Sequence, residues 1–153
     1  MRLNKQYYKF RLVTHINLDF KHFIIMTEIK IIEPALLIRT SRLFEQGMSA
    51  QELYEITRGV WKIGANRENA EYAFCIANGI VQEIYKIQRW QPAGTTPYET
   101  RAMMDANTRV KWMGRWEFIG QVAPDTIRNK YIRKSVAHYF AKGNANPINY
   151  LNI

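Results

Sequence analysis

The stretch EYAFCIANGIVQEIYKIQRW, residues 71–90, decides the fold of this chain. At its centre stands Asn78-Gly79, the dipeptide that most favours a two-residue hairpin turn, because both residues adopt left-handed backbone angles easily. We therefore expect a strand over residues 71–77, the turn, and a partner strand from Ile80 to Trp90. Cys75 lies mid-strand between apolar residues, which favours a buried core thiol over a nucleophile.

Alternation along the second strand assigns its side chains to two faces. Val81, Tyr85 and Ile87 fall on one face, and Lys86 and Trp90 fall on the other. Lys86 and Trp90 would then form a pair of cation and ring where the strand meets the following loop.

Local signals on the N-terminal side of the hairpin predict a strand and a helix. The apolar run from Ala35 to Arg39 follows Pro34 and is typical of a short buried strand. Ser49 and Glu52 have the spacing of a capping box, so we expect a helix over about residues 50–58, ended or bent by Gly59.

The C-terminal half is predicted to hold a long loop, one strand, two short helices and a final short strand. The loop covers 91–108, the strand runs from Arg109 to Val122, and the first helix starts at Pro124-Asp125. Ser135 would cap the second helix, over 136–141, and the last strand ends at Leu151. The fold class is α+β, with a small curved mixed or antiparallel sheet, or a PUA-like barrel, and a few short helices.

Length and composition indicate one domain. The chain has 153 residues, of which 47% are hydrophobic, enough to fill a core. Residues 1–25 have no capping signal and no clean period, so they are expected to be a loose extension of a domain at 26–153. No apolar run reaches membrane-spanning length and there is a single cysteine, which favours a cytoplasmic protein without membrane contact.

The net charge of +9 lies at the two ends of the chain. Residues 1–25 carry five Lys or Arg and one acid (+4), and residues 126–153 carry five and no acid (+5), so the remaining residues sum to zero. Basic ends on a neutral body suit contact with a polyanion, although a solubilising surface gives the same pattern.

Every tryptophan has a basic neighbour in the sequence, an arrangement that suits stacking on a base beside a phosphate. The pairs are Trp61-Lys62, Arg89-Trp90, Lys111-Trp112 and Arg115-Trp116. If residues 109–122 form a strand, alternation sends Trp112 and Trp116 to the core and their basic neighbours to the other face. Trp61 could meet Arg58 across one helical turn.

No catalytic or metal-binding constellation is found in the sequence. The histidines His15, His22 and His138 are scattered, so no metal or cofactor site is expected. Glu28-Ile29-Lys30 has only Asp19 upstream, a poor order for a magnesium-dependent nuclease. We therefore expect no catalysis by the chain itself, and an unrecognised nuclease is the weakest alternative.

Several spaced runs give the chain a resemblance over about residues 34–152. They include 53–61 (LYEITRGVW), 114–120 (GRWEFIG) and 146–150 (NPINY). Together they resemble the C-terminal accessory region of bacterial GIY-YIG endonuclease-like (LEM-type) proteins. The nuclease half of those proteins has no counterpart here, because residues 1–33 lack the GIY and YIG tripeptides. The family often has Gly at the position of Arg133, a departure that bears on the geometry between the last two helices.

The resemblance and the charge pattern lead to two main hypotheses. The first is a nucleic-acid-binding or base-reading accessory module that contacts DNA or RNA; the hairpin with its Trp-bearing strand also resembles PUA-like barrels. The second is a protein-interaction or regulatory domain that serves a separate nuclease or defence effector. For the first, the expected contacts are Arg58, Trp61, Lys86, Trp90, Lys111, Arg115, Arg128, Arg133 and Lys134.

Overall fold

The hairpin at Asn78-Gly79 forms the middle of the sheet. It joins β3 (Tyr72–Ala77) to β4 (Ile80–Pro92), which pair antiparallel. Asn78 has φ 52° and Gly79 has φ 75°, the two left-handed residues that a tight hairpin turn of this hand requires. All six residues of β3 are buried, so this strand is covered on both faces.

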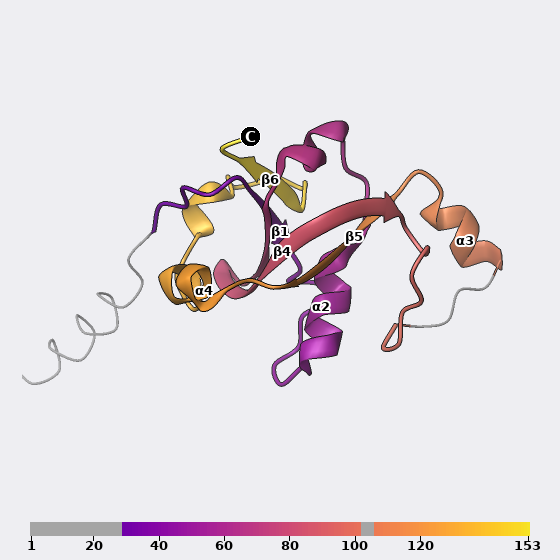
Figure 1. The fold of residues 1–153 in the computed structure, drawn as a ribbon, viewed down its shortest axis with the longest axis horizontal. Helices are drawn as coiled ribbons and strands as arrows, with labels where there is room; N and C mark the ends of the chain where they lie inside the picture. The colour runs from indigo at the N-terminus through magenta and orange to yellow at the C-terminus, as the bar shows by residue number, and fades with distance from the viewer. Residues whose placement is uncertain (1–28, 102–105) are drawn as a thin grey trace, which may run out of the picture.

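The computed structural model describes residues 29–101 and 106–153, in which six strands form one mixed sheet. Their order is β2-β5-β4-β3-β1-β6, and the sheet curls into a half-barrel (Figure 1). β1 runs parallel to β3, and the other neighbouring pairs are antiparallel. The remaining strands are β1 (Ala35–Arg39), β2 (Gly59–Trp61), β5 (Trp116–Val122) and β6 (Ile148–Leu151). The predicted α+β class with a small curved sheet is confirmed.

The predicted strand over residues 35–39 and the predicted helix over about residues 50–58 are confirmed, and the helix starts at Ser49 as expected. α2 (Ala50–Arg58) begins at Ser49, whose side chain accepts from the Glu52 amide at 3.2 Å while Glu52 accepts from the Ser49 amide at 2.7 Å. This is the predicted capping box. Gly59 ends the helix in an extended conformation and continues directly into β2.

Two bulges in β4 divide its side chains between two cores. The pairing register shifts at Gln82 against β3 and at Gln88 against β5. A bulge adds one residue and reverses the alternation beyond it. As a result Val81 and Ile84 belong to one core, whereas Tyr85 and the half-buried Trp90 contact the other.

The expected pairing of Lys86 with Trp90 is therefore wrong. The bulge at Gln88 turns Trp90 toward the core that contains Phe118, while Lys86 lies opposite Tyr72 on the other side of the sheet. The ring centroids of Trp90 and Phe118 are 5.5 Å apart in an edge-to-face contact, and Trp90 Nε1 donates to the Arg67 carbonyl at 3.1 Å.

Each core is covered by different elements. α2 and the 3-10 helix η1 (Ala65–Asn69) cover the side of Phe118, where Tyr54 packs against Tyr85. α4 (Asp125–Tyr131) and the 3-10 turn η2 (Ala137–Tyr139) cover the side of Phe74, which Tyr131 contacts. Figure 1 shows α2 and α4 on separate parts of the sheet.

The prediction of one strand over residues 109–122 is wrong in its first half. α3 (Ala106–Trp112) is a helix, and only Trp116–Val122 is a strand. Gly114, with φ 70°, turns the chain between the two, and Trp112 packs against Tyr98 of the preceding loop. A short alternation of apolar and basic residues does not distinguish a strand from a helix. Here the long-range contact of Trp112 with Tyr98 favours the helix.

The second predicted C-terminal helix is reduced to the turn η2. Ser135 makes no capping hydrogen bond and instead bridges to Ile80 at the base of the hairpin. The chain reaches Ser135 through Arg133, which has φ 63°, a left-handed angle that glycine adopts most easily. The predicted helix at Asp125 and the final strand are confirmed. The expected extension at 1–25 lies outside the described residues.

Candidate nucleic-acid interface

The loop after β4 is fastened to the sheet by Glu117, a fully buried residue of β5. The Glu117 carboxylate accepts from the backbone amides of Gly94 at 3.0 Å and Thr96 at 2.9 Å, and from the Gln91 side chain at 2.8 Å. It also forms an ion pair with Arg58 at 3.1 Å. Burial would raise the pKa of Glu117, but these hydrogen bonds outweigh burial and lower its pKa.

A second buried carboxylate, Glu55 of α2, holds the next part of the same loop. It accepts from the amides of Glu99 at 2.7 Å and Thr100 at 2.8 Å, from the Thr100 hydroxyl, and from Gln51 at 3.0 Å. Burial alone would raise the pKa of Glu55, but the hydrogen bonds, with that from the Thr100 side chain the strongest, lower its pKa to about 2. Glu55 is thus charged and saturated with donors, which suits an anchor better than a proton-transfer group.

Arg58 is enclosed by the same loop, with 2% of its surface exposed. Its guanidinium donates to the Pro97 carbonyl at 3.0 Å and lies 3.7 Å from the centre of the Tyr98 ring. The expected contact of Arg58 with a phosphate or base edge is at odds with this placement, because the side chain is sealed in and its partners are internal. Its ion-pair partner is Glu117 of β5.

The fastened loop in turn positions side chains at one end of the molecule. Tyr98 makes an edge-to-face contact with Trp112 of α3, with ring centroids 5.4 Å apart. Arg101 donates to the Gly59 carbonyl at 2.8 Å. Arg101 and Trp112 are therefore held on the body by the loop that Glu55 and Glu117 anchor.

These residues line a small cationic hollow beside α3, with a volume of about 220 Å³. Its lining residues are Val60, Arg101, Lys111, Trp112 and Arg115. The Arg115 side chain donates to the carbonyl of Lys111 at 3.2 Å, which ties the end of the helix to the start of β5. Among the described residues, no carboxylate forms an ion pair with these three cations.

The cationic hollow corrects the expectation that rings and charges separate in this segment. A strand would have placed Trp112 opposite Lys111, but a helix followed by a turn brings Lys111, Trp112 and Arg115 to one hollow. Trp116, the other ring of this segment, is half-buried and lies under the Arg67 guanidinium at 3.5 Å.

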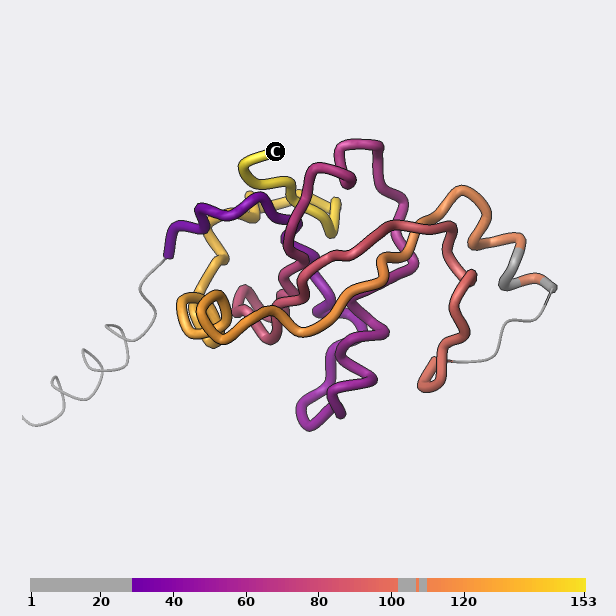
Figure 2. Tube along the Cα trace, in the orientation of Figure 1, coloured from indigo at the N-terminus to yellow at the C-terminus, as the bar shows by residue number. Residues whose placement is uncertain are grey.

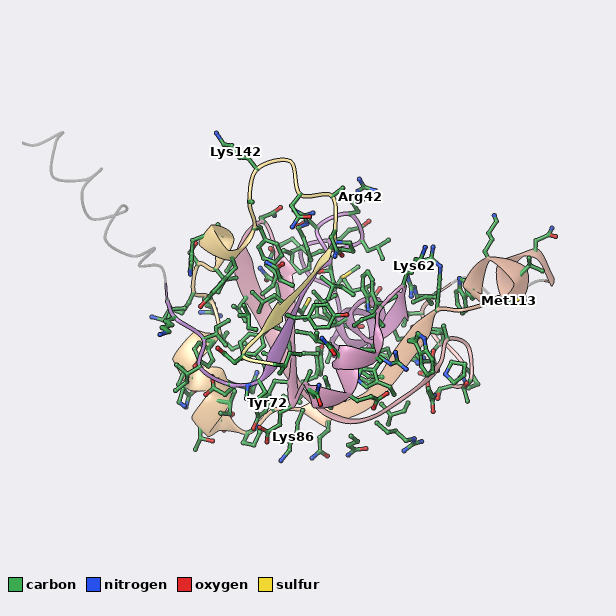
Figure 3. The ribbon with its side chains drawn as sticks, turned by 90° about the horizontal axis from the view of Figure 1, so that it is seen from above. Arg42, Lys62, Tyr72, Lys86, Met113 and Lys142 are labelled. Atoms are coloured by element: carbon green, nitrogen blue, oxygen red, sulfur yellow. The ribbon has the colours of Figure 1, made fainter. Side chains whose placement is uncertain are left out.

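The tip of α3 exposes apolar side chains next to these cations. Val110 is 68% exposed and Met113 is 77% exposed. α3 projects from the body in Figure 1, and Figure 3 shows Met113 beside this helix, where the chain turns back toward β5. A second hollow of about 560 Å³ lies between this tip and the turn at Gly94, so Trp112 is accessible from two sides.

The other expected contacts are dispersed. Arg128 forms ion pairs with Glu83 at 2.8 Å and Asp125 at 3.1 Å, so it is largely neutralised. Burial tends to lower the pKa of Arg128, but the stronger hydrogen bonds with Glu83 raise it. Arg133 is exposed and Lys134 half-buried beside the base of the hairpin, and Lys86 is exposed on β4. These three are not brought together with the cationic hollow.

Trp61 lies at the end of β2 and lines a separate pocket with Arg39 and Arg42. Its indole N–H donates to the Thr57 carbonyl at 2.7 Å. The expected partnership of Trp61 with Arg58 is not formed, because Arg58 turns toward Glu117.

Sequence reasoning missed Arg101 and assigned Trp112 to the core. The pair Lys111-Trp112 was a usable signal, but its meaning depended on the type of element that carries it. Arg101 gives no local signal, because its role follows from a loop that is positioned by residues far away in the sequence.

In the described part of the chain, the side chains that could bind metal lie apart and the cysteine is buried. Within residues 29–101 and 106–153, no three His, Cys, Asp or Glu side chains are placed to share a metal ion. Cys75 is fully buried, and burial raises the pKa of its thiol. None of the helices in the same residues has the length and hydropathy required to cross a bilayer.

Comparison of the chain with protein-family models, with curated proteins and with solved structures finds no match.

Proposed function

We propose that this chain is a nucleic-acid-binding accessory module that contacts DNA or RNA and performs no catalysis of its own. The cationic hollow carries the proposal, because Arg101, Lys111 and Arg115 gather around one accessible tryptophan without a neutralising carboxylate among the described residues. Basic side chains neutralise phosphates, and an indole ring stacks on bases of any sequence.

The ion pairs formed by other basic residues favour the cationic hollow as the binding surface. Arg58, Arg67, Arg128 and Lys130 each form an ion pair with a carboxylate of this chain. The resemblance to an accessory region of nuclease-like proteins agrees with a role beside a separate nuclease subunit.

Anisotropy of a short fluorescent oligothymidylate and of a matched duplex, titrated at several salt concentrations, tests the proposal. We expect binding at low salt that falls steeply as salt rises, because counterions are released from the phosphates. The double variant Lys111→Glu/Arg115→Glu should weaken binding and reduce the salt slope by about two, one unit per lost phosphate contact.

The double variant Lys30→Glu/Lys86→Glu is the matched control. It makes the same change in net charge at exposed positions away from α3, and it should retain most of the affinity and the slope. Equal losses in the two double variants would mean that binding is a property of net charge and not of the cationic hollow. Adding magnesium to the same mixtures tests for cleavage, which we do not expect.

The exposed Val110 and Met113 favour a second function, docking to a protein such as a separate nuclease or defence effector. This function predicts that neither oligonucleotide binds at low salt. It also predicts that Met113→Lys disrupts assembly with the partner while Lys62→Ala, an exposed change outside the α3 tip, does not.

A further inference from the structure

The sheet does not close, and its open seam holds a pocket. The two edge strands are β2 and β6, and the chain beyond β2 returns to β6, where the Gly64 amide donates to the Tyr150 hydroxyl at 3.2 Å. Figure 2 shows the segment around residues 62–70 beside the C-terminal strand. A pocket of about 680 Å³, which we call the seam pocket, lies between Trp61 at the end of β2 and Pro147 just before β6. It is lined by 39–43, Trp61, 143–145 and Pro147.

The walls of the seam pocket are held in place by internal hydrogen bonds. The Trp61 ring is oriented by its bond to the Thr57 carbonyl at 2.7 Å. Arg39 donates to the carbonyls of Asn144 at 2.6 Å and Asn146 at 3.3 Å, and so fixes the opposite loop. The pocket is preformed, and its volume falls within the range of about 300–1,000 Å³ that is common for small-ligand sites.

The groups that remain available in the seam pocket are an aromatic ring and a cation. Arg42 is exposed, and no acceptor among the described residues binds its guanidinium. The Ser41 hydroxyl and the Asn144 side chain also line the pocket and add polar groups that can form hydrogen bonds. A planar, anionic ligand with hydrogen-bonding edges fits this set.

We propose that the seam pocket binds one unstacked nucleobase, with the indole of Trp61 against the base and Arg42 on the adjoining phosphate. The inference rests on the proposed function, and it adds a site where a single base is held apart from its neighbours. Figure 3 supports a continuous path, since Lys142, Arg42 and Lys62 lie along one side of the molecule that leads toward α3. A strand that follows these cations could reach both Trp61 and Trp112.

A pocket-filling variant tests the seam pocket without touching the core. Ala145 is exposed and lines the pocket, so Ala145→Phe should occupy the space of the base. Ala141→Phe, in the same loop but outside the pocket lining, is the matched control. Thermal unfolding of both variants checks that neither change disturbs the fold.

Binding is measured with an oligothymidylate and with an abasic strand of the same length. We expect Ala145→Phe to lower the preference for the intact strand by about fivefold or more, the scale of one lost stacking contact, and to leave the abasic affinity unchanged. Ala141→Phe should leave the preference intact, and Arg42→Gln should weaken both strands. Equal preference in the two Phe variants would overturn the seam pocket and leave the proposed function standing, whereas absence of binding by every form, wild type included, would overturn both.

Discussion

At the scale of single residues, the loop after β4 depends on a buried ion pair and on a glycine that leaves room for it. Arg58 and Glu117 are both buried and form an ion pair. The loop that encloses them adds hydrogen bonds to both side chains. Gly59 lies directly beneath this loop. A Cβ at Gly59 would meet the Tyr98 hydroxyl at 2.3 Å and the Glu117 Cβ at 2.9 Å, so the absence of a side chain is required for the loop to seat.

Gly59→Ala should therefore destabilise the chain by about 1–3 kcal/mol through overpacking. Tyr98→Phe removes the atom closest to the added methyl group. The double variant should therefore be destabilised by at least about 0.5 kcal/mol less than the two single variants added together. Urea unfolding of the four forms measures the coupling.

Gly64→Ala is the control for this cycle, because its Cβ would meet only the Tyr150 hydroxyl, at an ordinary 3.8 Å. Its effect should stay within about 0.5 kcal/mol. Strict additivity of Gly59→Ala and Tyr98→Phe would show that the loop does not press on Gly59.

At the scale of elements, local signals in the sequence were sufficient where the cause is local. The capping box at Ser49 and the Asn78-Gly79 turn involve residues within a few positions, and both were predicted correctly. The bulges in β4 and the helix at 106–112 were not, because they depend on contacts between distant segments such as Trp90 with Phe118 and Trp112 with Tyr98. Propensity is a weak prior when tertiary contacts of this kind compete with it.

The attachment of the loop at 93–101 is expected to depend on pH, because two carboxylates with lowered pKa values hold it. The pKa of Glu55 is about 2 in the folded chain against an ordinary value of 4.5, so the unfolded chain takes up a proton first as pH falls. Stability that Glu55 contributes is present above about pH 4.5 and is lost progressively as pH falls toward about 2. Glu117 acts in the same direction, since its pKa is also lowered.

Glu55→Gln should lower stability at neutral pH and flatten its dependence on pH in this acidic window. Urea unfolding across the window measures both effects. Glu68→Gln, an exposed residue paired with Arg67, is the control and should leave the profile nearly unchanged. Parallel profiles for wild type and Glu55→Gln would show that Glu55 does not anchor the loop through its charge.

At the scale of the whole molecule, the fold sorts cations that look alike in the sequence. Lys111 and Arg115 were expected to be contacts and lie on an open cationic hollow, whereas Arg58 and Arg128 carried the same expectation and are engaged in ion pairs. Composition gives the number of charges but does not show which of them form ion pairs between a helix and a strand. The candidate surface could therefore be predicted only in part.

The half-barrel also predicts how stability is distributed. β3 is buried throughout and has neighbours on both sides, while β6 has four residues and one neighbour. Backbone amides of β3 should exchange with solvent only on global unfolding, and those of β6 should exchange faster through local opening of the seam. Amide exchange followed by NMR measures this order, and equal protection of β6 and β3 would contradict it.

The bulges in β4 have a consequence for how related sequences would align. Gln82 and Gln88 are the extra residues, so a chain that lacked either one would regain regular alternation and still send Val81, Tyr85 and Trp90 to the same sides. Single-residue gaps inside a strand normally scramble its two faces. In descendants or relatives of this chain, deletions should instead be tolerated at these two glutamines, and length variation within β4 should concentrate there.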